Sequence, residues 1–334
     1  MTGAPEIAYC LPTFNSSARI ERCLRGVLAQ QTASREILLV DNASTDDTVA
    51  KARALLNGIP GARIVVNETN IGRIENWNRC LELATGRYIK FALANDVLLP
   101  GGAKMLLSVA QSNPGATLIC SKQRDVEVVP AVPEAAPANF STKIFTSSEA
   151  LNHFCQASND SGGLGGMLID GDCVRQHSLR FPTKIPFWAD FHFVIELAAR
   201  GKTVYVDAAS YLFDKSVKSR FALSGTGANS KSLCFEAREC SLLLAKLLSQ
   251  HGSEPWRGFE FLHSIYTGAS WYGEQPTMSW RETLALFADA GPYKSSALKY
   301  RCWRSFGRAE HFLKRALSKL GLYHYPWEKK SAAE

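Results

Sequence analysis

The sequence predicts an α/β protein with a Rossmann-like, mostly parallel central sheet, followed by a helical C-terminal region. Short apolar runs of strand length alternate with amphipathic stretches of about ten residues, which is typical of parallel βαβ units with right-handed crossovers. Several of the apolar runs are followed directly by polar residues. Those residues fall at the carboxyl ends of the strands, where open α/β sheets bind their ligands.

The expected strands and helices follow in order along the chain. The runs expected to form strands lie at residues 7–11, 36–40, 63–67, 88–94, 116–121, 167–169 and 203–206. The stretches expected to form helices lie at residues 20–28, 48–56, 76–84, 106–111, 146–157 and 187–201. Short apolar runs indicate strands buried on both faces, whereas apolar residues three or four positions apart indicate one buried helix face. Residues 125–141 hold three prolines and are expected to form a loop over the sheet.

The segment from Tyr88 to Pro100 is expected to form the centre of the site. Gly86 should end the preceding helix, because Gly is the usual residue just past a helix C-terminus. The apolar run from Tyr88 then predicts a strand that ends in Asn95 and Asp96. A carboxylate at the carboxyl end of a central strand lies where ligand chemistry takes place in open α/β sheets.

Length and composition are those of an ordinary globular protein. The chain has 334 residues, of which 46% are hydrophobic and 21% charged. The N-terminal residues lack the basic and apolar regions of a secretory signal, and no apolar run approaches the roughly 18 residues that a membrane span needs. The nine cysteines include no CxxC pair, so reduced, buried thiols and a cytoplasmic location are expected.

The positive charge is concentrated near the C-terminus. Residues 294–330 carry ten Lys and Arg against two Glu, a net charge of +8 within a chain of net charge +7. The apolar residues between Leu298 and Leu320 form one helical stripe, with basic residues beside it. Such a helix suits an anionic membrane surface, which would place the protein peripherally on the inner face of the membrane. A helix packed on the rest of the protein explains the pattern equally well, and nucleic acid is not an expected partner because no recognised module accompanies the charge.

Four short motifs lie at or between the ends of the expected strands. They are Pro12–Asn15, Val40–Thr48, Asn70–Asn78 and Gly86–Phe91. Their order and spacing resemble those of family 2 glycosyltransferases over residues 6–103, and the resemblance resumes at residues 187–206. The resemblance implies a GT-A fold, with a glycosyltransferase domain at 1–230 and a helical C-terminal region at 231–334. It also implies inverting transfer of a hexosyl or deoxyhexosyl group from a nucleoside diphosphate.

The resemblance assigns the donor site to the ends of the first strands. Asp41 matches the aspartate that accepts a hydrogen bond from the donor's base, and Pro12 and Thr13 match the loop that lies against the nucleoside. A strand-end carboxylate suits the imide N–H of uracil or thymine, so a UDP- or dTDP-sugar is expected. The other matching donor-site residues are Asn15, Asn70, Gly72, Asn76, Asn95 and Arg220. From the residues alone, Asp41 could also be a helix cap, and Arg220 an exposed surface arginine.

Asp96 matches the metal-binding carboxylate of the family's DXD signature. Mg²⁺ or Mn²⁺ held there would neutralise the diphosphate leaving group. The chain departs from the usual Asp-x-Asp-Asp, because Leu93 and Asn95 replace two of the acids. Asn95 can still bond a ribose hydroxyl or offer a neutral metal ligand. Metal dependence is therefore left open, and Asp96 could also be a simple turn residue.

Asp190 matches the general base of the family, at the start of a helix rich in aromatic residues. Inversion needs one carboxylate to take the proton of the acceptor hydroxyl as its oxygen attacks the anomeric carbon. The apolar neighbours Phe187 and Trp188 would raise the basicity of that carboxylate by desolvation, and Trp188 could stack on a sugar. Gly163 and Gly165 match the floor of the acceptor pocket. An aspartate that only stabilises the helix N-terminus is the plainer interpretation of Asp190.

The sequence thus predicts a cytoplasmic or peripheral-membrane glycosyltransferase of surface polysaccharide biosynthesis, with a glycan or lipid-linked acceptor. The alternative is a nucleotide-sugar-binding protein without turnover, because the metal motif has lost acids. A dinucleotide-dependent oxidoreductase would need a glycine-rich turn after the first strand, and the segment Pro12–Asn15 is not one.

Overall fold

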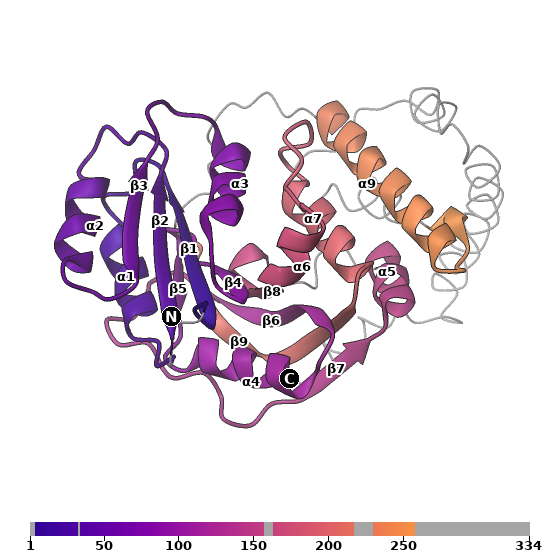
Figure 1. The fold of residues 1–334 in the computed structure, drawn as a ribbon, viewed down its shortest axis with the longest axis horizontal. Coiled ribbons are helices and arrows are strands. Elements are labelled where there is room, and N and C mark those ends of the chain that lie inside the picture. Colours follow the sequence, from indigo (N-terminus) through magenta and orange to yellow (C-terminus); the bar gives the residue numbers. More distant parts are fainter. Residues whose placement is uncertain (1–3, 33, 157–162, 217–229, 258–334) are drawn as a thin grey trace, which may run out of the picture.

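The computed structural model describes residues 4–32, 34–156, 163–216 and 230–257. These residues form a central nine-stranded sheet with helices packed on both of its faces (Figure 1). The basic segment 294–330 and Arg220 lie outside the described residues. Among the described helices, none is long and apolar enough to cross a membrane.

The elements have the following bounds. The strands are β1 Ile7–Thr13, β2 Arg35–Asp41, β3 Ala62–Val66, β4 Tyr88–Phe91, β5 Asp96–Leu98, β6 Ala116–Val126, β7 Thr142–Phe145, β8 Met167–Asp170 and β9 Lys202–Asp214. The α-helices are α1 Ile20–Leu28, α2 Thr48–Leu56, α3 Arg73–Leu83, α4 Gly102–Ser112, α5 Ser147–Gln156, α6 Gly171–Gln176, α7 Ala189–Ala198 and α9 Ser230–Gln250. Two short 3₁₀ helices are η1 Leu164–Gly166 and η2 Pro255–Arg257.

The strand order β3-β2-β1-β4-β8-β6-β9-β5 places the first strand near the middle of the sheet. Strands β3, β2, β1 and β4 are parallel, and β6 runs parallel to β9. Strand β8 is antiparallel to its two neighbours, and β5 and β7 are antiparallel to β9. The predicted α/β fold with a parallel Rossmann-like half is confirmed. Because parallel strands share a direction, the ends of β1, β2 and β4 reach the same edge of the sheet.

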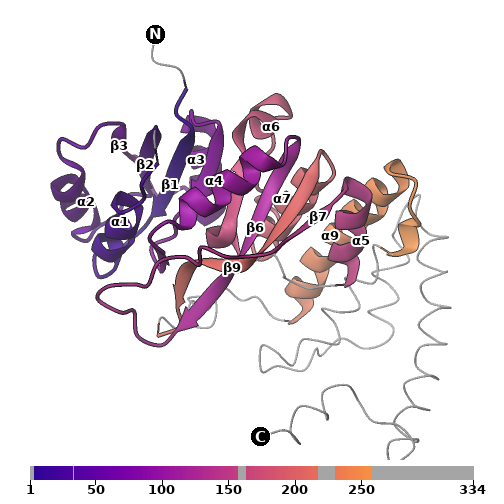
Figure 2. The ribbon, with the colours of Figure 1, turned by 90° about the horizontal axis from the view of Figure 1, so that it is seen from below.

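Two cores fill the two faces of the sheet. Helices α1, α2 and α4 cover one face, and α3, α5, α6, α7 and α9 cover the other. Helix α4 lies below the strands in Figure 1 and in front of them in Figure 2, whereas α6 and α7 lie above the strands in Figure 1. In β4, Ile89 and Phe91 belong to the core beneath α3 and α7, whereas Tyr88 belongs to the core beneath α1 and α4. Side chains alternate along a strand, so Lys90 points to the same face as Tyr88.

Some elements differ from the sequence prediction. The helix expected at 48–56 has those bounds, but the strand expected at 88–94 ends at Phe91. The Asp96 N–H donates to the Leu93 carbonyl at 2.8 Å, so the chain turns there and Asp96 begins a separate strand. Strand β5 then pairs with β9, which lies far along the chain. The short elements β7 and α6 were not predicted. Pairing with β9 stabilises β7, and the Asp170 side chain caps the start of α6.

The first helix of the C-terminal region packs on the sheet domain. Ala237, Cys240, Leu244 and Leu248 of α9 are fully buried in the same core as α7. Helix α9 lies beside α5 and α7 in Figure 1. The domain boundary near residue 230 remains a prediction, but this helix is part of the hydrophobic core of the preceding domain.

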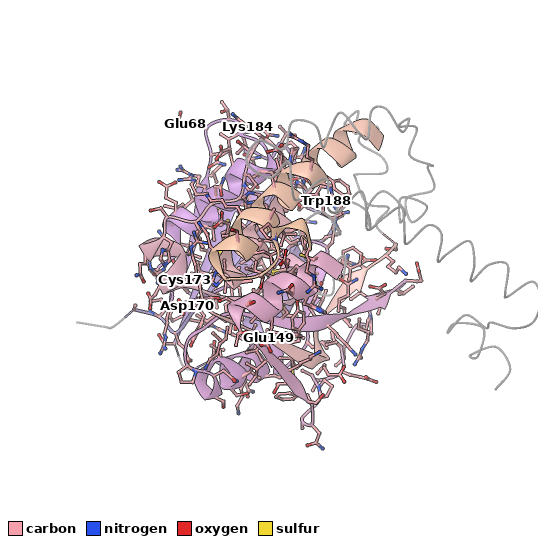
Figure 3. All side chains as sticks on the ribbon, turned by 90° about the vertical axis from the view of Figure 1, so that its right-hand side faces the viewer. Glu68, Glu149, Asp170, Cys173, Lys184 and Trp188 are labelled. Carbon is pink, nitrogen blue, oxygen red and sulfur yellow. The ribbon has the colours of Figure 1, made fainter. Side chains whose placement is uncertain are left out.

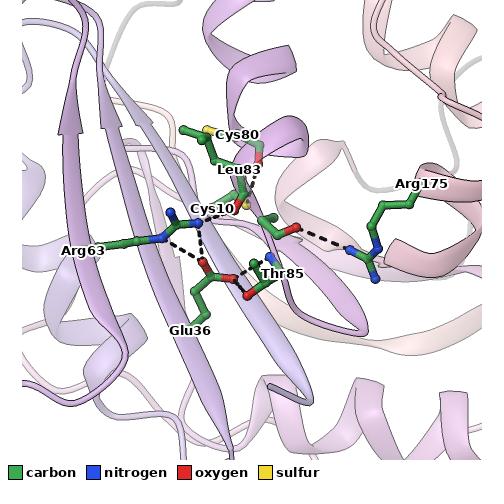
Figure 4. Close-up of polar contacts among 8 residues, drawn as sticks. Cys10, Glu36, Arg63, Cys80, Leu83, Thr85 and Arg175 are labelled. Carbon is green, nitrogen blue, oxygen red and sulfur yellow. Dashed lines mark hydrogen bonds and ion pairs between the residues drawn. The ribbon is translucent and has the colours of Figure 1, made fainter. Parts of the chain in front are cut away.

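A buried carboxylate fastens the start of β2 to its neighbours (Figure 4). Glu36 is 5% exposed and accepts hydrogen bonds from Arg63 Nε at 3.0 Å and Nη2 at 2.7 Å. Its second oxygen accepts from Thr85 N at 2.8 Å and from Thr85 Oγ1 at 2.9 Å. Arg63 also donates to the Leu83 carbonyl. Glu36 therefore ties β2 to β3 and to the end of α3, below the edge that carries the site.

Replacing Glu36 by alanine should lower the free energy of unfolding by about 2–3 kcal/mol, because four hydrogen bonds to a buried charge are lost. Urea denaturation followed by circular dichroism measures the change. Glu68→Ala is the matched control, since Glu68 is exposed and should change stability by less than about 0.5 kcal/mol. Equal losses in the two variants would contradict the role given to Glu36.

Candidate active site

The ends of β1 and β2 bring the predicted nucleoside residues together. Thr13 lies opposite Asp41 in the parallel register, next to Pro12. Thr13 Oγ1 donates to Asp41 Oδ1 at 2.9 Å, Ser44 Oγ donates to the same oxygen at 2.6 Å, and Ser44 N donates to Oδ2 at 2.8 Å. Asp41 is fully buried. Its carboxylate is thus held at the predicted edge, with both oxygens bonded to hydroxyl and amide donors of the protein.

Asn15 fixes the loop that covers Asp41. Its backbone N–H donates to Ser44 Oγ at 2.8 Å, and its Oδ1 accepts from Thr45 N at 2.9 Å. Asn15 has a φ of 45°, a left-handed conformation that Asn tolerates better than most residues. The predicted donor-site residue Asn15 therefore acts on Asp41 through Ser44.

Four asparagine side chains bond to one another beside Asp41. Asn42 Nδ2 donates to Asn70 Oδ1 at 2.7 Å, and Asn67 Nδ2 donates to Asn42 Oδ1 at 3.1 Å and to Asn76 Oδ1 at 2.9 Å. Asn76 Nδ2 donates to the carbonyl that precedes Asp41 in β2, at 3.0 Å. This network holds the segment before α3 against the end of β2. Asn76 is only 3% exposed, so its side chain serves the framework of the loop.

The turn from Asn70 to Gly72 is bound to the same network. Gly72 N donates to Asn70 Oδ1 at 2.9 Å, and Ile71 N donates to Asn42 Oδ1 at 2.9 Å. Gly72 has a φ of 88°, which a residue with a side chain rarely adopts. Asn70 and Gly72 are exposed, unlike Asn76, and stand at the N-terminus of α3.

Asp96 points into the interior of the domain. It is 2% exposed, and its Oδ2 has no hydrogen-bond partner among the described residues. A Cβ placed on Gly165 would lie 2.2 Å from that oxygen, so only glycine fits beside it. Lys90, fully buried on β4, donates from Nζ to the Gly165 carbonyl and lies 5.7 Å from the ring centroid of Tyr211. Gly165 therefore touches both charged residues.

Burial shifts the pKa values of Asp96 and Lys90 in opposite directions. Desolvation raises the pKa of Asp96 to about 7, and the positive charge of Lys90 opposes that rise. Desolvation lowers the pKa of Lys90 to about 8, and the negative charge of Asp96 opposes that fall. Each residue thus favours the charged form of the other.

The turn between β4 and β5 faces the open edge of the sheet. Asn95 is partly exposed, and its carbonyl accepts from Asp214 N at 3.4 Å, at the end of β9. Arg22 of α1 forms an ion pair with the Asp214 carboxylate. The partly exposed side chains of this turn offer a metal ion one neutral amide oxygen, that of Asn95, because Leu93 replaces an acid.

The residues of this edge do not fit a divalent metal ion. Within the part of the chain that the structure describes, no three His, Cys, Asp or Glu side chains gather in a way that could hold one. Mg²⁺ and Mn²⁺ prefer carboxylate oxygens and water. The Asp96 carboxylate is buried beside an ammonium group, and Asn95 is neutral. No step is therefore assigned to a metal.

Asp190 lies in the first turn of α7, as expected, and is half-buried. Its Oδ1 accepts from Phe191 N at 2.8 Å. Desolvation raises the pKa of Asp190, whereas the Phe191 hydrogen bond and the positive charge of Arg73 lower it. Arg73 is the first residue of α3, where it donates to the Pro186 carbonyl and lies 4.9 Å from the ring centroid of Trp77. The turn before α3 thus links Asp190 to the asparagine network beside β2.

The aromatic residues before α7 are anchored by the C-terminal helix. Glu236 of α9 accepts from Phe187 N at 2.7 Å and from Trp188 N at 3.3 Å. Trp188 is 8% exposed, and its ring packs against Phe187 and Phe191 with centroids 5.1 and 6.0 Å away. Trp188 lies close to α9 in Figure 3. Because Trp188 is so little exposed, its ring cannot present a whole face to a ligand.

Gly163 and Gly165 border the site from the side of β6 and β9. Gly163 has a φ of 66° and lies at a cleft of about 690 Å³ lined by residues of β6, β7, β9 and α5. The predicted residues within the described part of the chain thus lie in three groups, around Asp41, Asp96 and Asp190. Lys90 and Glu236 were not predicted. Lys90 was the one charged residue in an apolar run, which was a usable signal, whereas nothing local marked Glu236.

Comparison with known proteins finds a family match in the N-terminal half of the chain. Residues 9–168 match the family described as Glycosyl transferase family 2. An uncharacterized protein of Mycobacterium tuberculosis (strain CDC 1551 / Oshkosh) is 44% identical over 102 residues, which are 30% of this chain and 31% of that protein. A PGL/p-HBAD biosynthesis glycosyltransferase of Mycobacterium tuberculosis (strain ATCC 25618 / H37Rv) is 33% identical over 95 residues, 28% of this chain and 37% of that one. The matches therefore span only about a third of these relatives.

Solved structures agree on the fold. The crystal structure of S. aureus TarS 1-349 superposes with a TM-score of 0.63 at 16% identity, over 86% of this chain and 82% of that chain. The same TarS fragment in complex with UDP-GlcNAc superposes with a TM-score of 0.62 at 15% identity, over 85% of this chain and 80% of that chain. At such identities the likeness shows the GT-A fold alone. Residues 9–168, a little under half of the chain, match glycosyl transferase family 2.

Proposed function

We propose that the protein transfers a hexosyl or deoxyhexosyl group from a nucleoside diphosphate to an acceptor hydroxyl, with inversion. The observation that carries this proposal is the half-buried Asp190 carboxylate at the start of α7, whose pKa is raised by desolvation. The match of residues 9–168 to glycosyl transferase family 2 supports the reaction class. A carboxylate with this environment is a stronger base than an exposed one.

Asp190 would act as the general base. As the acceptor oxygen forms its bond to the anomeric carbon, its proton passes to the Asp190 carboxylate. The bond from the anomeric carbon to the diphosphate oxygen breaks on the opposite face, and the electron pair leaves with the diphosphate. Phe191 N holds one carboxylate oxygen at 2.8 Å, which leaves the other for the proton.

The nucleoside would bind at the ends of β1 and β2. Asp41 would accept the imide N–H of uracil or thymine once Ser44 releases one of the carboxylate oxygens that it now occupies. Pro12 and Thr13 would lie against the nucleoside. The UDP-GlcNAc complex of TarS, which shares the fold, supports a UDP-type donor.

The acceptor would be a glycan or a lipid-linked intermediate of surface polysaccharide assembly, met at the inner face of the membrane. A relative named as a PGL/p-HBAD biosynthesis glycosyltransferase supports a role in glycan biosynthesis. The basic segment 294–330 supports an anionic membrane surface as a partner. Gly163, Gly165 and the edge of Trp188 would border the acceptor.

A nucleotide-sugar-binding protein without turnover is the second candidate. The enclosed Asp41 carboxylate and the neutral residues Leu93 and Asn95 favour it. Donor binding without any product across a panel of acceptors would support this candidate, whereas turnover that depends on Asp190 would exclude it.

Asp190→Asn should reduce sugar transfer by about 10²–10⁴-fold, because the proton acceptor is lost. Donor affinity, measured by calorimetry, should change less than about threefold, since Asp190 does not contact the nucleotide in this proposal. Chromatography of the released nucleoside diphosphate measures the transfer. Asp172→Asn is the matched control, an exposed aspartate in the first turn of α6, and should keep full activity.

The pH dependence of kcat/KM should report the Asp190 carboxylate. The base must be deprotonated, and its pKa is raised by desolvation, so kcat/KM should fall as the pH drops through a value above the ordinary aspartate pKa of about 3.9. A pH series with a stable donor measures this limb. An acid limb that persists unchanged in the residual activity of Asp190→Asn would assign it to another group.

Glu236→Ala should lower kcat by about tenfold, equivalent to about 1.4 kcal/mol, because the backbone before α7 loses its acceptor and Asp190 is less well placed. Donor affinity should stay within about twofold. Glu239→Ala is the control on the same helix, since Glu239 pairs with its neighbour Arg238. A parallel fall of kcat in both variants would point to a general loss of α9 packing.

A further inference from the structure

The surroundings of Asp96 contain one buried cation. The carboxylate lies between α1, β4, β9 and the Gly163–Gly166 segment, where it acts electrostatically on Cys23, Lys90 and Tyr211. Lys90 is 0% exposed and Asp96 is 2% exposed. A buried lysine is stable only with a partner or a lost proton. Here the Gly165 carbonyl accepts its hydrogen bond, and the Asp96 carboxylate, which also lies against Gly165, supplies the opposite charge.

The space beside Asp96 is filled. A Cβ on Gly165 would lie 2.2 Å from Asp96 Oδ2, about the length of a bond from Mg²⁺ or Mn²⁺ to oxygen. A divalent ion bound there would displace the Gly165 backbone, with which Lys90 bonds. It would also approach an ammonium group of the same sign, which the low dielectric of the interior makes unfavourable.

The exposed turn beside Asp96 adds no negative charge. Leu93, Ala94 and Asn95 are partly exposed and uncharged, so Asp96 is the one acid of this turn. Lys90 balances that acid, and the local net charge is zero. A divalent ion binds where carboxylates outnumber cations, and here the one carboxylate is matched by one cation.

We infer that Lys90 is the fixed counter-charge of Asp96, bridged to it by Gly165, and that the protein binds its donor without a divalent ion at Asp96. Lys90 is then a positioning residue that joins β4 to the Gly163–Gly166 floor of the site. The part of this inference that concerns the donor rests on the proposed function, whereas the charge pair does not.

Metal binding to the wild-type protein tests the inference without a donor. Mn²⁺ alone is titrated into the full chain up to about 1 mM and followed by electron paramagnetic resonance, which sees the free ion. We expect no bound Mn²⁺. Any Mn²⁺ that does bind should bind equally to the wild-type protein and to Asp96→Asn. One Mn²⁺ per chain that Asp96→Asn removes would overturn the inference.

Donor binding supplies the second measurement. Calorimetry with UDP-GlcNAc and with a dTDP-hexose is run in Mn²⁺ and in EDTA, with an expected Kd ratio below twofold. A tenfold tighter Kd in Mn²⁺, abolished in Asp96→Asn, would overturn the inference. If neither probe binds in either buffer, the proposed donor class is contradicted. The Mn²⁺ titration and the variants below would then still test whether Asp96 binds a metal ion and whether Lys90 is its partner.

A double-mutant cycle tests the charge pair itself. Lys90→Met and Asp96→Asn should each lower Tm by about 5 °C or more, because each leaves a buried charge without its partner. The double variant should lose clearly less than the sum of the two, or fold where Lys90→Met does not. Additive losses, or a double variant that fails to fold while both single variants fold, would overturn the pairing. Lys104→Met, at an exposed lysine of α4, should leave Tm unchanged.

Discussion

The parallel register of β1 between β2 and β4 is the constraint on which the rest of the structure depends. It sets Thr13 opposite Asp41 and Cys10 opposite Phe91, so the ends of three strands reach one edge together. The turn that carries Asn95 and Asp96 starts just beyond the end of β4. Any slip of this register would separate the nucleoside edge from that turn.

Among the buried or half-buried carboxylates of this scaffold, four have surroundings that give them different roles. Glu36 bonds to Arg63 and Thr85 and secures the framework. Asp41 accepts hydroxyl and amide hydrogens at the nucleoside edge. Asp96 has a buried ammonium nearby, and Asp190 has mainly aromatic neighbours and one backbone hydrogen bond. The same functional group thus serves as a structural contact, a candidate ligand contact, the partner of a buried cation and a candidate base.

The C-terminal region takes part in the site through its first helix. Glu236 accepts the two backbone N–H groups that precede α7, and Cys240 and Leu244 extend the core beneath that helix. Asp190, the candidate base, comes two residues after the second of those N–H groups. Its placement therefore depends on the packing of α9. This coupling makes the catalytic half of the proposed site sensitive to the C-terminal region.

The sequence by itself determined the α/β class, the approximate positions of most of the elements and the resemblance to family 2 glycosyltransferases. Apolar periodicity and strand-end polar residues are local patterns, so the helix at 48–56, the edge at Asp41 and the helix start at Asp190 could all be located from them. Only the tertiary structure decided that Asp96 and Lys90 both lie against Gly165, and that Glu236 reaches the start of α7. The physical reason is that burial and the partner of a charge depend on contacts between residues far apart in the chain, which no local pattern encodes.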